Sequence, residues 1–405
     1  MDAVEAALTE YVAALVGCEA ITSASVERAF RRVRRHRFLE LWYRPNLTEN
    51  RLAFLPVDYD RDHPSSANFA EIYSNQALVT AVQHSLPTSS TSQPALVARM
   101  LELLDLRPGM RVLEIGTGTG YNAALLAEIL GAEGRVCTVE FQGDVAERAR
   151  GYLTEEGYHD VQVVHGDGYL GVPEAGPFDR IVATVRCPDL SSHWLEQLSP
   201  DGFLLLPLHH GFSDPLVRIE RDPTDVEGAI GRVVDNSGFM PIQGTLASAN
   251  SWQSYMITGL PKEPTTSRPL PEGFALDQGT AESPFGSPED WGFRFFLALS
   301  SRELWANNEG YGLADPGGSS ALILTSDGMQ GYSASGDTRS LDRLHDRLLH
   351  LHDEWNRLGR PTPPDYSLAF SPATRIEKPP EVPGREWFIV RPFFFEIVRL
   401  PEAVG

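Results

Sequence analysis

Between residues 95 and 207, blocks with a helical spacing of apolar residues alternate with short, nearly continuous apolar runs. Apolar positions three and four residues apart predict helices, and short apolar runs predict buried strands. The predicted elements are helix 95–106, strand 111–115, helix 121–130, strand 135–139, helix 145–156, strands 161–164 and 180–184, helix 194–198 and strand 203–207. This alternation predicts an α/β fold with a doubly wound, Rossmann-like parallel sheet that helices cover on both faces.

The flanking sequences have other patterns. Residues 3–39 have the spacing of two helices, with Ser23 to Ser25 as the cap of the second. The polar, Pro- and Ser-rich sequence at 44–92 predicts a loop over a site. After a proline-rich stretch, a leucine-striped helix begins at Ser340 and ends before Gly359. Strand-like blocks flank it at 321–325, 366–370, 387–391 and 394–400, which predicts an α+β domain.

These changes of pattern divide the chain into three predicted regions. Residues 1–92 form an N-terminal helical segment with the loop, residues 93–258 form the α/β core, and residues 259–405 form an accessory α+β domain. The two halves share no internal repeat, so the last region is not a copy of the core.

Composition narrows the class of protein. The 405 residues include 34 Lys plus Arg and 55 Asp plus Glu, a formal net charge of −21. Such an acidic chain is poorly suited to bind nucleic acid or anionic lipid, and its apolar runs fall far below the ~18 residues of a membrane span. The acidic amino terminus does not resemble a signal peptide, and three widely spaced cysteines fit a reducing compartment. We expect a cytoplasmic protein without membrane or nucleic-acid partners.

Positive charge is concentrated in one segment. Six arginines and a histidine lie between Arg28 and Arg37, on the second predicted helix and just after it. A charge run on a helix is usually a solvated face. The alternative is a docking surface for an acidic peptide, and the sequence leaves both open.

The strongest sign of a ligand site is the segment Val112–Tyr121. An apolar strand ends there in a glycine-rich turn that opens a helix, and glycines let backbone amides approach a ligand closely. A dinucleotide fingerprint would need its third glycine at position 121, where this chain has tyrosine, and the third glycine is Gly120. No Gly-Lys-Ser/Thr follows, which excludes a P-loop. The spacing predicts a nucleotide-binding turn and disfavours NAD.

Two acidic residues follow at the ends of the next predicted strands. Glu140 comes 24 residues after Gly116, where a carboxylate can accept hydrogen bonds from ribose hydroxyls. Asp167, followed by Gly168, ends the third strand, where it can accept from an adenine amino group. Each feature alone could be a tight turn or a solvated carboxylate. Together, in this order, they predict a ligand crevice at one edge of the sheet.

At these residues the chain resembles the S-adenosylmethionine-dependent methyltransferases, and more narrowly the protein-L-isoaspartate O-methyltransferases. The resemblance covers roughly residues 10 to 245. It rests on Ser92–Met100, Val112–Tyr121, His165–Gly168, Pro177–Asp179 and Leu204–Leu208.

The resemblance implies a role for each matching residue. Gly116, Thr117, Gly118 and Gly120 would hold the methionine portion of S-adenosylmethionine, with Glu114 also in the cofactor-binding set. Glu140 would bind the ribose, and Asp167 with Gly168 the adenine. S-adenosylhomocysteine would be the product, and no metal is implied.

The family's Thr-Ile-Ser active-site stretch corresponds to Ser90-Thr91-Ser92, which places Ser92 at the catalytic serine. The alternative is that Ser92 only caps the helix that Gln93-Pro94 begins. A carboxylic acid with a pKa of ~4 is ionised at neutral pH, so methylating it requires no general base. The site must place the carboxylate in line with the methyl group and exclude water. Hydroxyl groups can orient a carboxylate without neutralising it. An ester formed on Asp or isoAsp can then close to a succinimide.

Two features depart from the repair enzymes of the family. About 160 residues follow the matched core, and Thr88–Ser92 is unusually rich in hydroxyls. Both resemble the subfamily associated with lanthipeptides and other ribosomally made peptides. That resemblance implies esterification of a specific Asp in a peptide, leading through a succinimide to isoaspartate. The alternative is general protein-L-isoaspartate repair, and a third hypothesis is a noncatalytic binding protein on this fold.

The carboxyl-terminal region contains no reaction motif. His345 and His352 lie seven residues apart on the leucine-striped helix, but without a third ligand they are more often structural than metal-binding. His209 and His210 are expected to pack at a strand end. We expect this region to recognise the peptide substrate or to form a homodimer.

Overall fold

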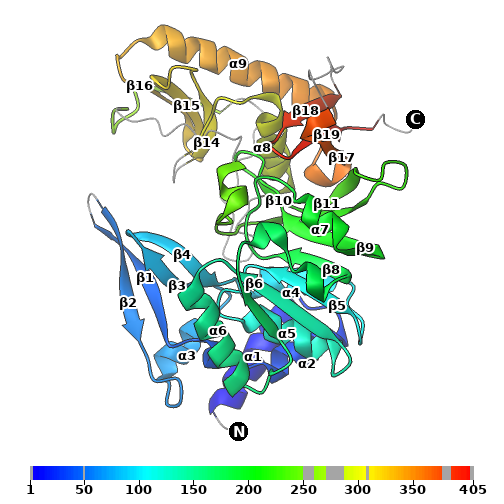
Figure 1. Ribbon diagram of the computed structural model, residues 1–405. Helices are drawn as coiled ribbons and strands as arrows, with labels where there is room; N and C mark the ends of the chain where they lie inside the picture. Colours follow the sequence, from blue (N-terminus) through cyan, green and yellow to red (C-terminus); the bar gives the residue numbers. More distant parts are fainter. Residues whose placement is uncertain are drawn as a thin grey trace. The chain divides into compact units, whose positions relative to one another are not determined.

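The computed structural model describes residues 3–48, 51–249, 260–270, 287–306, 310–375 and 385–401. The chain forms two compact units (Figure 1). The first comprises residues 1–186, 191–206 and 239–247, and the second comprises residues 187–190, 207–238 and 248–405. The sequence-based boundaries at residues 92 and 258 remain predictions. The compact units differ from them because residues 207–238 group with the carboxyl-terminal residues.

The first unit is built on parallel strands in the order β9-β8-β5-β6-β7. The strands are β5 (Arg111–Ile115), β6 (Arg135–Glu140), β7 (Gln162–His165), β8 (Phe178–Ala183) and β9 (Leu198–Pro207), and the helices are α4 (Pro94–Leu103), α5 (Tyr121–Leu130), α6 (Gly143–Glu155) and α7 (Ser192–Glu196). The chain proceeds from β5 outward to β7 and then returns to β8 and β9 on the other side of β5. This order is that of a doubly wound sheet, and it confirms the predicted α/β fold.

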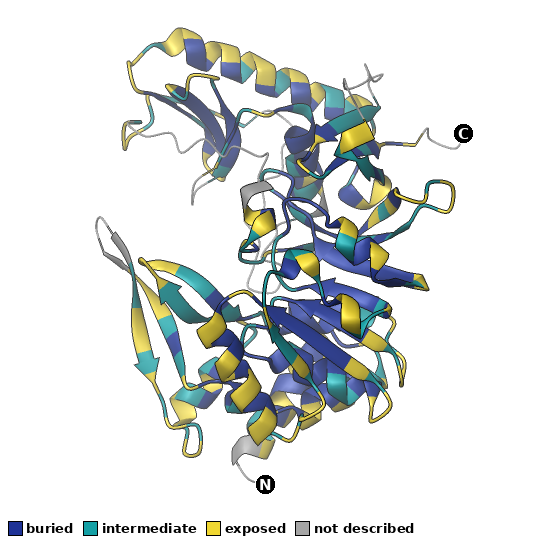
Figure 2. Ribbon diagram, in the orientation of Figure 1, coloured by how far each residue is buried: buried dark blue, intermediate teal, exposed yellow. Residues whose placement is uncertain are grey.

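The central strand explains why simple apolar runs predicted this sheet. On β5, Val112 and Leu113 are fully buried and Ile115 is 2% exposed (Figure 2). A parallel strand covered on both faces can be apolar at successive positions instead of alternating. The strand and the following helix α5 therefore have the bounds that the sequence predicted.

The amino-terminal part begins with helices α1 (Ala3–Gly17) and α2 (Ala24–Arg32), followed by the 3-10 turn η1 (Arg35–Phe38). The Ser23 hydroxyl accepts a hydrogen bond from the Val26 N–H at 3.3 Å, as the predicted cap requires.

The predicted loop at 44–92 is wrong, because this segment forms an antiparallel sheet in the order β2-β1-β3-β4. Its elements are β1 (Leu41–Thr48), β2 (Arg51–Asp58), α3 (Ser66–Ile72), β3 (Leu78–Gln83) and β4 (Leu86–Thr91). Strand β4, Leu-Pro-Thr-Ser-Ser-Thr, has few apolar residues, and its ladder to β3 supplies the order that its composition does not suggest. Most of this segment is therefore regular secondary structure within the first unit, and not a loop.

The described part of the second unit contains two sets of antiparallel strands. One has the order β10-β11-β17-β19-β18 and the other β12-β16-β15-β14-β13. Their strands are β10 (Asp214–Arg221), β11 (Ala229–Ser237), β12 (Thr266–Arg268), β13 (Leu304–Ala306), β14 (Gly310–Ala314), β15 (Ser320–Thr325), β16 (Gly328–Ser333), β17 (Ser367–Pro372), β18 (Glu386–Val390) and β19 (Phe394–Arg399), and the helices are α8 (Pro288–Ser300) and α9 (Thr338–Arg357). The predicted α+β architecture is confirmed, while the elements β10 to β14, β16 and α8 were not predicted.

Helix α9 matches its predicted pattern. Leu341, Leu344, Leu348 and Trp355 are buried along one side, and Gly359 follows the helix with φ +88°. The predicted proline-rich stretch that begins after residue 259 lies in large part outside the described residues.

The histidines of the second unit have structural partners. His352 is 3% exposed and lies 3.2 Å from the Asn356 amide nitrogen, and burial lowers its pKa. His210 is fully buried beside Glu396. Within the described residues, no cluster of three or more His, Cys, Asp or Glu side chains could hold a metal ion, and no helix is long and apolar enough to cross a membrane.

Candidate active site

The glycine-rich turn connects β5 to α5 and needs glycine at several positions. Gly116, Gly118 and Gly120 have φ values of +99°, +53° and +82°, a region that other residues rarely adopt. A Cβ atom on Gly116 would lie 2.8 Å from Val185 Cγ1, and one on Gly118 would lie 3.1 Å from the Ser90 carbonyl oxygen. Neighbouring protein atoms therefore approach the turn closely at these glycines, and the predicted active-site residue Ser90 lies directly against it.

A buried chain of hydrogen bonds supports the turn from inside. The Thr138 hydroxyl donates to Glu114 Oε2 at 2.6 Å, and the Asn122 amide donates to Glu114 Oε1 at 2.7 Å. The Thr117 and Thr138 hydroxyls lie 2.7 Å apart. Burial raises the pKa of Glu114 to about 7. Because the side chains of Glu114 and Thr117 have interior partners, their predicted contribution to cofactor binding would come through support of the turn and through backbone groups.

Glu140 ends β6 beside the turn, as predicted. Its Oε2 accepts from the Gly118 N–H at 2.9 Å and its Oε1 from the Gln142 N–H at 3.1 Å. Burial raises the pKa of Glu140, and the backbone hydrogen bonds oppose that effect. The next residue, Phe141, is 44% exposed. An exposed aromatic ring beside a ribose-binding carboxylate can stack on a purine. The sequence interpretation missed Phe141, although an aromatic residue after a strand-end acid could have indicated it.

Asp167 and Gly168 follow β7 at the corresponding edge of the sheet. The Asp167 carboxylate accepts from the Tyr169 N–H at 3.0 Å and from the Thr245 hydroxyl at 2.7 Å. A Cβ atom on Gly168 would lie 2.7 Å from Ile115 Cγ2, so only glycine allows this approach to β5. The predicted residues therefore converge at the carboxyl ends of β5, β6 and β7. An adenine amino group would share the Asp167 carboxylate with Thr245.

Ser90, Thr91 and Ser92 lie at the end of β4 and just after it. Thr91 is 3% exposed, whereas Ser90 and Ser92 are half-buried. The interpretation of Ser92 as a helix cap is wrong, because the N-cap of α4 is Gln93, whose side chain makes no capping bond. The Asn75 carbonyl oxygen Oδ1 instead accepts from the Ala95 N–H at 2.9 Å.

Arg35 supports the segment Ser90–Ser92 from the protein interior, and the sequence interpretation did not identify it as a site residue. Its guanidinium is fully buried and donates to the carbonyl oxygens of Ile72 at 2.6 Å, Gln76 at 2.9 Å and Ser92 at 3.0 Å. Nothing in the run of arginines in the sequence indicates that Arg35 is buried.

Three other arginines of the run form ion pairs, and Arg28 and Arg34 are exposed. Arg37 contacts Glu156 at 2.6 Å, Arg31 contacts Glu27 at 2.8 Å and Arg32 contacts Glu128 at 3.2 Å. A docking surface for an acidic peptide on this segment stays a prediction.

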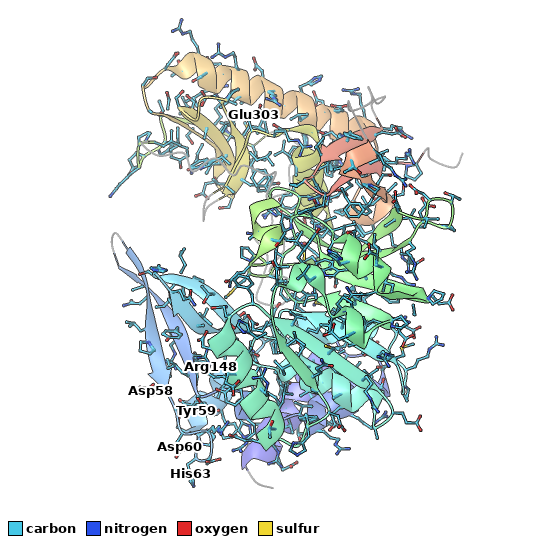
Figure 3. All side chains as sticks on the ribbon, in the orientation of Figure 1. Asp58, Tyr59, Asp60, His63, Arg148 and Glu303 are labelled. Atoms are coloured by element: carbon cyan, nitrogen blue, oxygen red, sulfur yellow. The ribbon has the colours of Figure 1, made fainter. Side chains whose placement is uncertain are left out.

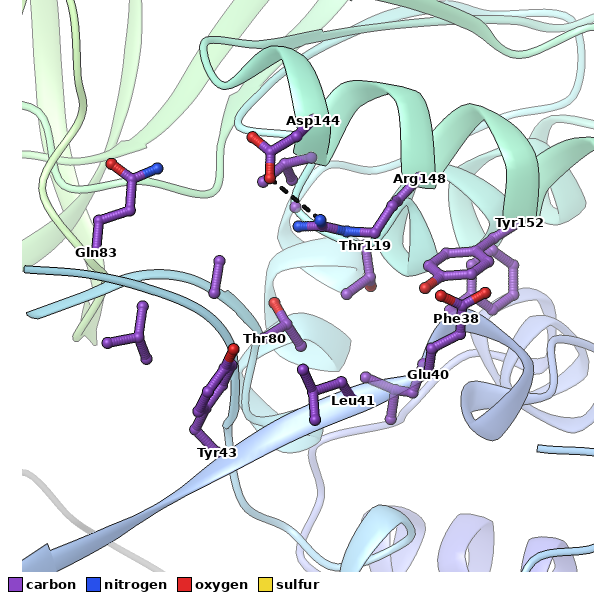
Figure 4. A pocket seen from close by; sticks show the side chains of 15 residues that line it. Phe38, Glu40, Leu41, Tyr43, Thr80, Gln83, Thr119, Asp144, Arg148 and Tyr152 are labelled. Atoms are coloured by element: carbon purple, nitrogen blue, oxygen red, sulfur yellow. Dashed lines mark hydrogen bonds and ion pairs between the residues drawn. The ribbon is translucent and has the colours of Figure 1, made fainter. Parts of the chain in front are cut away.

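A pocket of about 290 Å³ borders the turn at Gly118 and Thr119 (Figure 4). Strands β1 and β3 line it on one side, and α6 on the other. Gln83, Thr80 and Tyr43 line the pocket from the side of β1 and β3, and Arg148 lines it from α6 (Figure 4). Figure 3 shows the place of Arg148 in the chain. Arg148 is paired with Asp144 at 3.1 Å. The pocket is therefore predominantly polar.

The doubly wound order, the glycine-rich turn and the acidic residues at the ends of β6 and β7 define an S-adenosylmethionine-dependent methyltransferase. Residues 9–245 match the family described as protein-L-isoaspartate(D-aspartate) O-methyltransferase (PCMT). Because the match spans more than half of the chain, the protein belongs to this family, and it is an enzyme that uses S-adenosylmethionine.

Relatives with the same activity in their names include two enzymes of known source. The Methanothermobacter thermautotrophicus protein-L-isoaspartate O-methyltransferase is 44% identical over 154 residues, which are 38% of this chain and 70% of the relative. The Pyrococcus horikoshii enzyme is 39% identical over 164 residues, which are 39% of this chain and 71% of the relative. In both cases the match covers less than half of this chain.

A solved protein-L-isoaspartate O-methyltransferase aligns with 89% of this chain and 96% of its own, with a TM-score of 0.51 and 23% identity. This likeness in fold extends beyond residue 245, where the family match ends. The fold of that solved structure therefore includes a counterpart for part of the additional carboxyl-terminal length.

Proposed function

We propose that this enzyme methylates the free carboxylate of L-isoaspartyl residues in peptides or proteins. The main observation behind the proposal is that the segment Ser90-Thr91-Ser92 begins against the glycine-rich turn, where the Ser90 carbonyl oxygen lies beside Gly118. Residues 9–245 of the same chain match the protein-L-isoaspartate family. In that arrangement a carboxylate held by the hydroxyls would lie beside the cofactor's methyl group.

S-adenosylmethionine supplies an electrophilic methyl group when it is bound. Gly116, Gly118 and Gly120 would admit it at the turn, Glu140 would hold its ribose, and Asp167 its adenine. A substrate carboxylate is ionised at neutral pH, so the enzyme does not have to remove a proton. The rate then depends on alignment of the reacting atoms and on exclusion of water.

The serine and threonine hydroxyls are suited to that task because they orient a carboxylate without an opposing full charge. Arg35 is close to this segment, but its guanidinium is occupied by backbone carbonyl oxygens. Its charge would stabilise the shape of the segment and leave the substrate carboxylate nucleophilic.

A second candidate is esterification of one L-Asp in a ribosomally made, lanthipeptide-like peptide. The hydroxyl at Thr91, where the repair enzymes have isoleucine, favours it. Under either function, recognition of the peptide by the carboxyl-terminal region, or dimerisation through it, remains part of the proposal.

Mass spectrometry of the purified protein with S-adenosylmethionine and two peptides tests these functions. The peptides share one sequence and carry L-isoAsp or L-Asp at one position. We expect the isoAsp peptide to gain one methyl group and then to lose methanol as the succinimide forms. Methylation of the L-Asp peptide alone would favour the second candidate, and methylation of neither would contradict both for that sequence.

Substitution of Ser92→Ala tests the role of the hydroxyl. We expect kcat to fall roughly 10- to 100-fold, with little change in the Kd for S-adenosylhomocysteine, because the hydroxyl would orient the substrate and not the cofactor. Ser66→Ala, at an exposed serine in α3, is the control. Equal kinetics for Ser92→Ala and the control would remove Ser92 from the catalytic set.

A further inference from the structure

Gln142 connects the cofactor side of the site to the active-site strand. It is the N-cap residue of α6 and only 8% exposed, yet its side chain does not cap the helix. Its Nε2 donates to the Thr88 carbonyl oxygen at 2.8 Å, and its Oε1 accepts from Gln83 Nε2 at 3.0 Å. Its backbone N–H donates to Glu140 at 3.1 Å. One residue thus touches the predicted ribose ligand and both strands of the β3–β4 hairpin.

The hairpin needs such a connection because its own ladder is irregular. The pairing of β3 with β4 shifts register between Val79 and Ala81 and again between Ala81 and Val82. Among the described strands, β4 pairs only with β3. Additional bonds from outside the hairpin are therefore needed to hold β4 in one position, and the Gln142 amide supplies one at Thr88.

A shift of β4 would act directly on the proposed chemistry. Ser90 follows Thr88 by two residues, and its carbonyl oxygen lies against Gly118. Methyl transfer depends on the alignment of the reacting atoms, and a displacement of about 1 Å can lower the rate by about 100-fold. The backbone bond from Gln142 to Glu140 does not depend on the side chain, so loss of the amide group would leave the ribose ligand in place.

We propose that Gln142 is a positioning residue that holds the active-site strand β4 in register with the cofactor site. The expected effect of Gln142 on kcat rests on the proposed function. Its effect on the position of β4 can be measured without substrate. The Gln142 side chain is thereby assigned to the alignment of the substrate carboxylate, and not to cofactor affinity.

Three variants of the full chain test the proposal. Gln142→Leu removes both side-chain bonds at similar size. Gln142→Glu keeps an acceptor for Gln83 but places a carboxylate against the Thr88 carbonyl. Gln83→Leu removes only the outer bond and serves as the matched control. We expect kcat on the isoAsp peptide to fall roughly 10- to 100-fold in both Gln142 variants, and by less than about threefold in Gln83→Leu.

Two further measurements separate positioning from general damage. The Kd for S-adenosylhomocysteine should stay within about twofold of wild type in Gln142→Leu. Amide hydrogen exchange should become faster in residues 86–91 and remain unchanged in α5. Unchanged exchange in β4, wild-type kcat, or a parallel loss of S-adenosylhomocysteine affinity in Gln142→Leu would each overturn the proposal. If the wild-type enzyme methylates no isoAsp peptide, the proposed function fails, and the exchange measurement still decides whether Gln142 positions β4.

Discussion

Glu396 lies in a fully buried ionic cluster of the second unit, and its removal gives a sharp stability prediction. Its carboxylate accepts from Arg391 Nη2 at 2.6 Å and lies 3.0 Å from His210 Nε2. All three side chains are at most 1% exposed. Burial by itself raises the pKa of Glu396, but the positive charges of His210 and Arg391 outweigh that effect and lower it to about 2.

The size of the effect follows from this pKa. With an ordinary value of 4.5 and a value in the folded protein of about 2, the charged carboxylate stabilises the fold by about 3 kcal/mol at neutral pH. Because the folded pKa is depressed, this contribution is present above pH ~4.5 and is lost as the pH falls toward ~2. Removing one partner of a buried ion pair typically costs about 3–5 kcal/mol, which agrees with this value.

We therefore expect Glu396→Gln to lower the free energy of unfolding by about 3 kcal/mol at pH 7. The difference from wild type should shrink as the pH is lowered from 4.5 toward 2. Urea unfolding monitored by circular dichroism at several pH values measures both. Glu386→Gln is the matched control, because Glu386 pairs with Arg399 at 2.7 Å on the same β18–β19 hairpin but at the surface. It should cost less than about 1 kcal/mol. Equal losses in the two variants would refute the argument.

Two further predictions concern the turn. Burial raises the pKa of Glu114 to about 7, so the folded protein binds more protons than the unfolded chain between pH ~4.5 and ~7 and loses stability as the pH rises. The stability of Glu114→Gln relative to wild type should therefore increase by up to about 3 kcal/mol as the pH rises through this range. A difference that does not change with pH, as expected for the exposed Glu147→Gln, would contradict this. Gly118→Ala should weaken S-adenosylhomocysteine binding about 10-fold, from backbone strain and the contact with Ser90. Gly157→Ala shares the positive φ without a close neighbour, so equal binding losses would refute the contact.

The cluster around Glu396 also limits what can be learned by truncating the chain. Strand β11 pairs with β17, and the buried carboxylate of Asp189 accepts from the Phe393 N–H at 2.7 Å. Deletion of the residues after about 258, which the three-region division suggests, would remove these partners within the second unit. Point substitutions are therefore better tests of the carboxyl-terminal region than its removal.

The core could be predicted from the sequence because its signals are local. The strand 111–115 and the helix 121–130 are buried, and a segment buried on all sides is apolar over most of its length. The glycine-rich turn and the acids at 140 and 167 follow those segments directly, so their convergence at one sheet edge follows from the topology. The sheet at 41–91 could not be predicted in this way, although most of its pairing is between strands adjacent in the sequence, because strands such as Leu86–Thr91 are polar and lack an apolar pattern.

The tertiary structure decided which polar residues have which role. Arg35 and Arg34 are neighbours of the same type in the sequence, yet Arg35 is buried against the carbonyl oxygens behind Ser92 and Arg34 is exposed. Gln142 belongs to no recognisable sequence motif. Its proposed role comes from its side-chain amide group, which bonds to Thr88 and Gln83, 54 and 59 positions away in the sequence. Local apolar pattern and glycine spacing determined the class of fold and predict the place of the cofactor, because backbone conformation and burial act over a few residues. The assignment of individual hydrogen-bonding groups required the folded chain, because a donor's partner is set by distance in space.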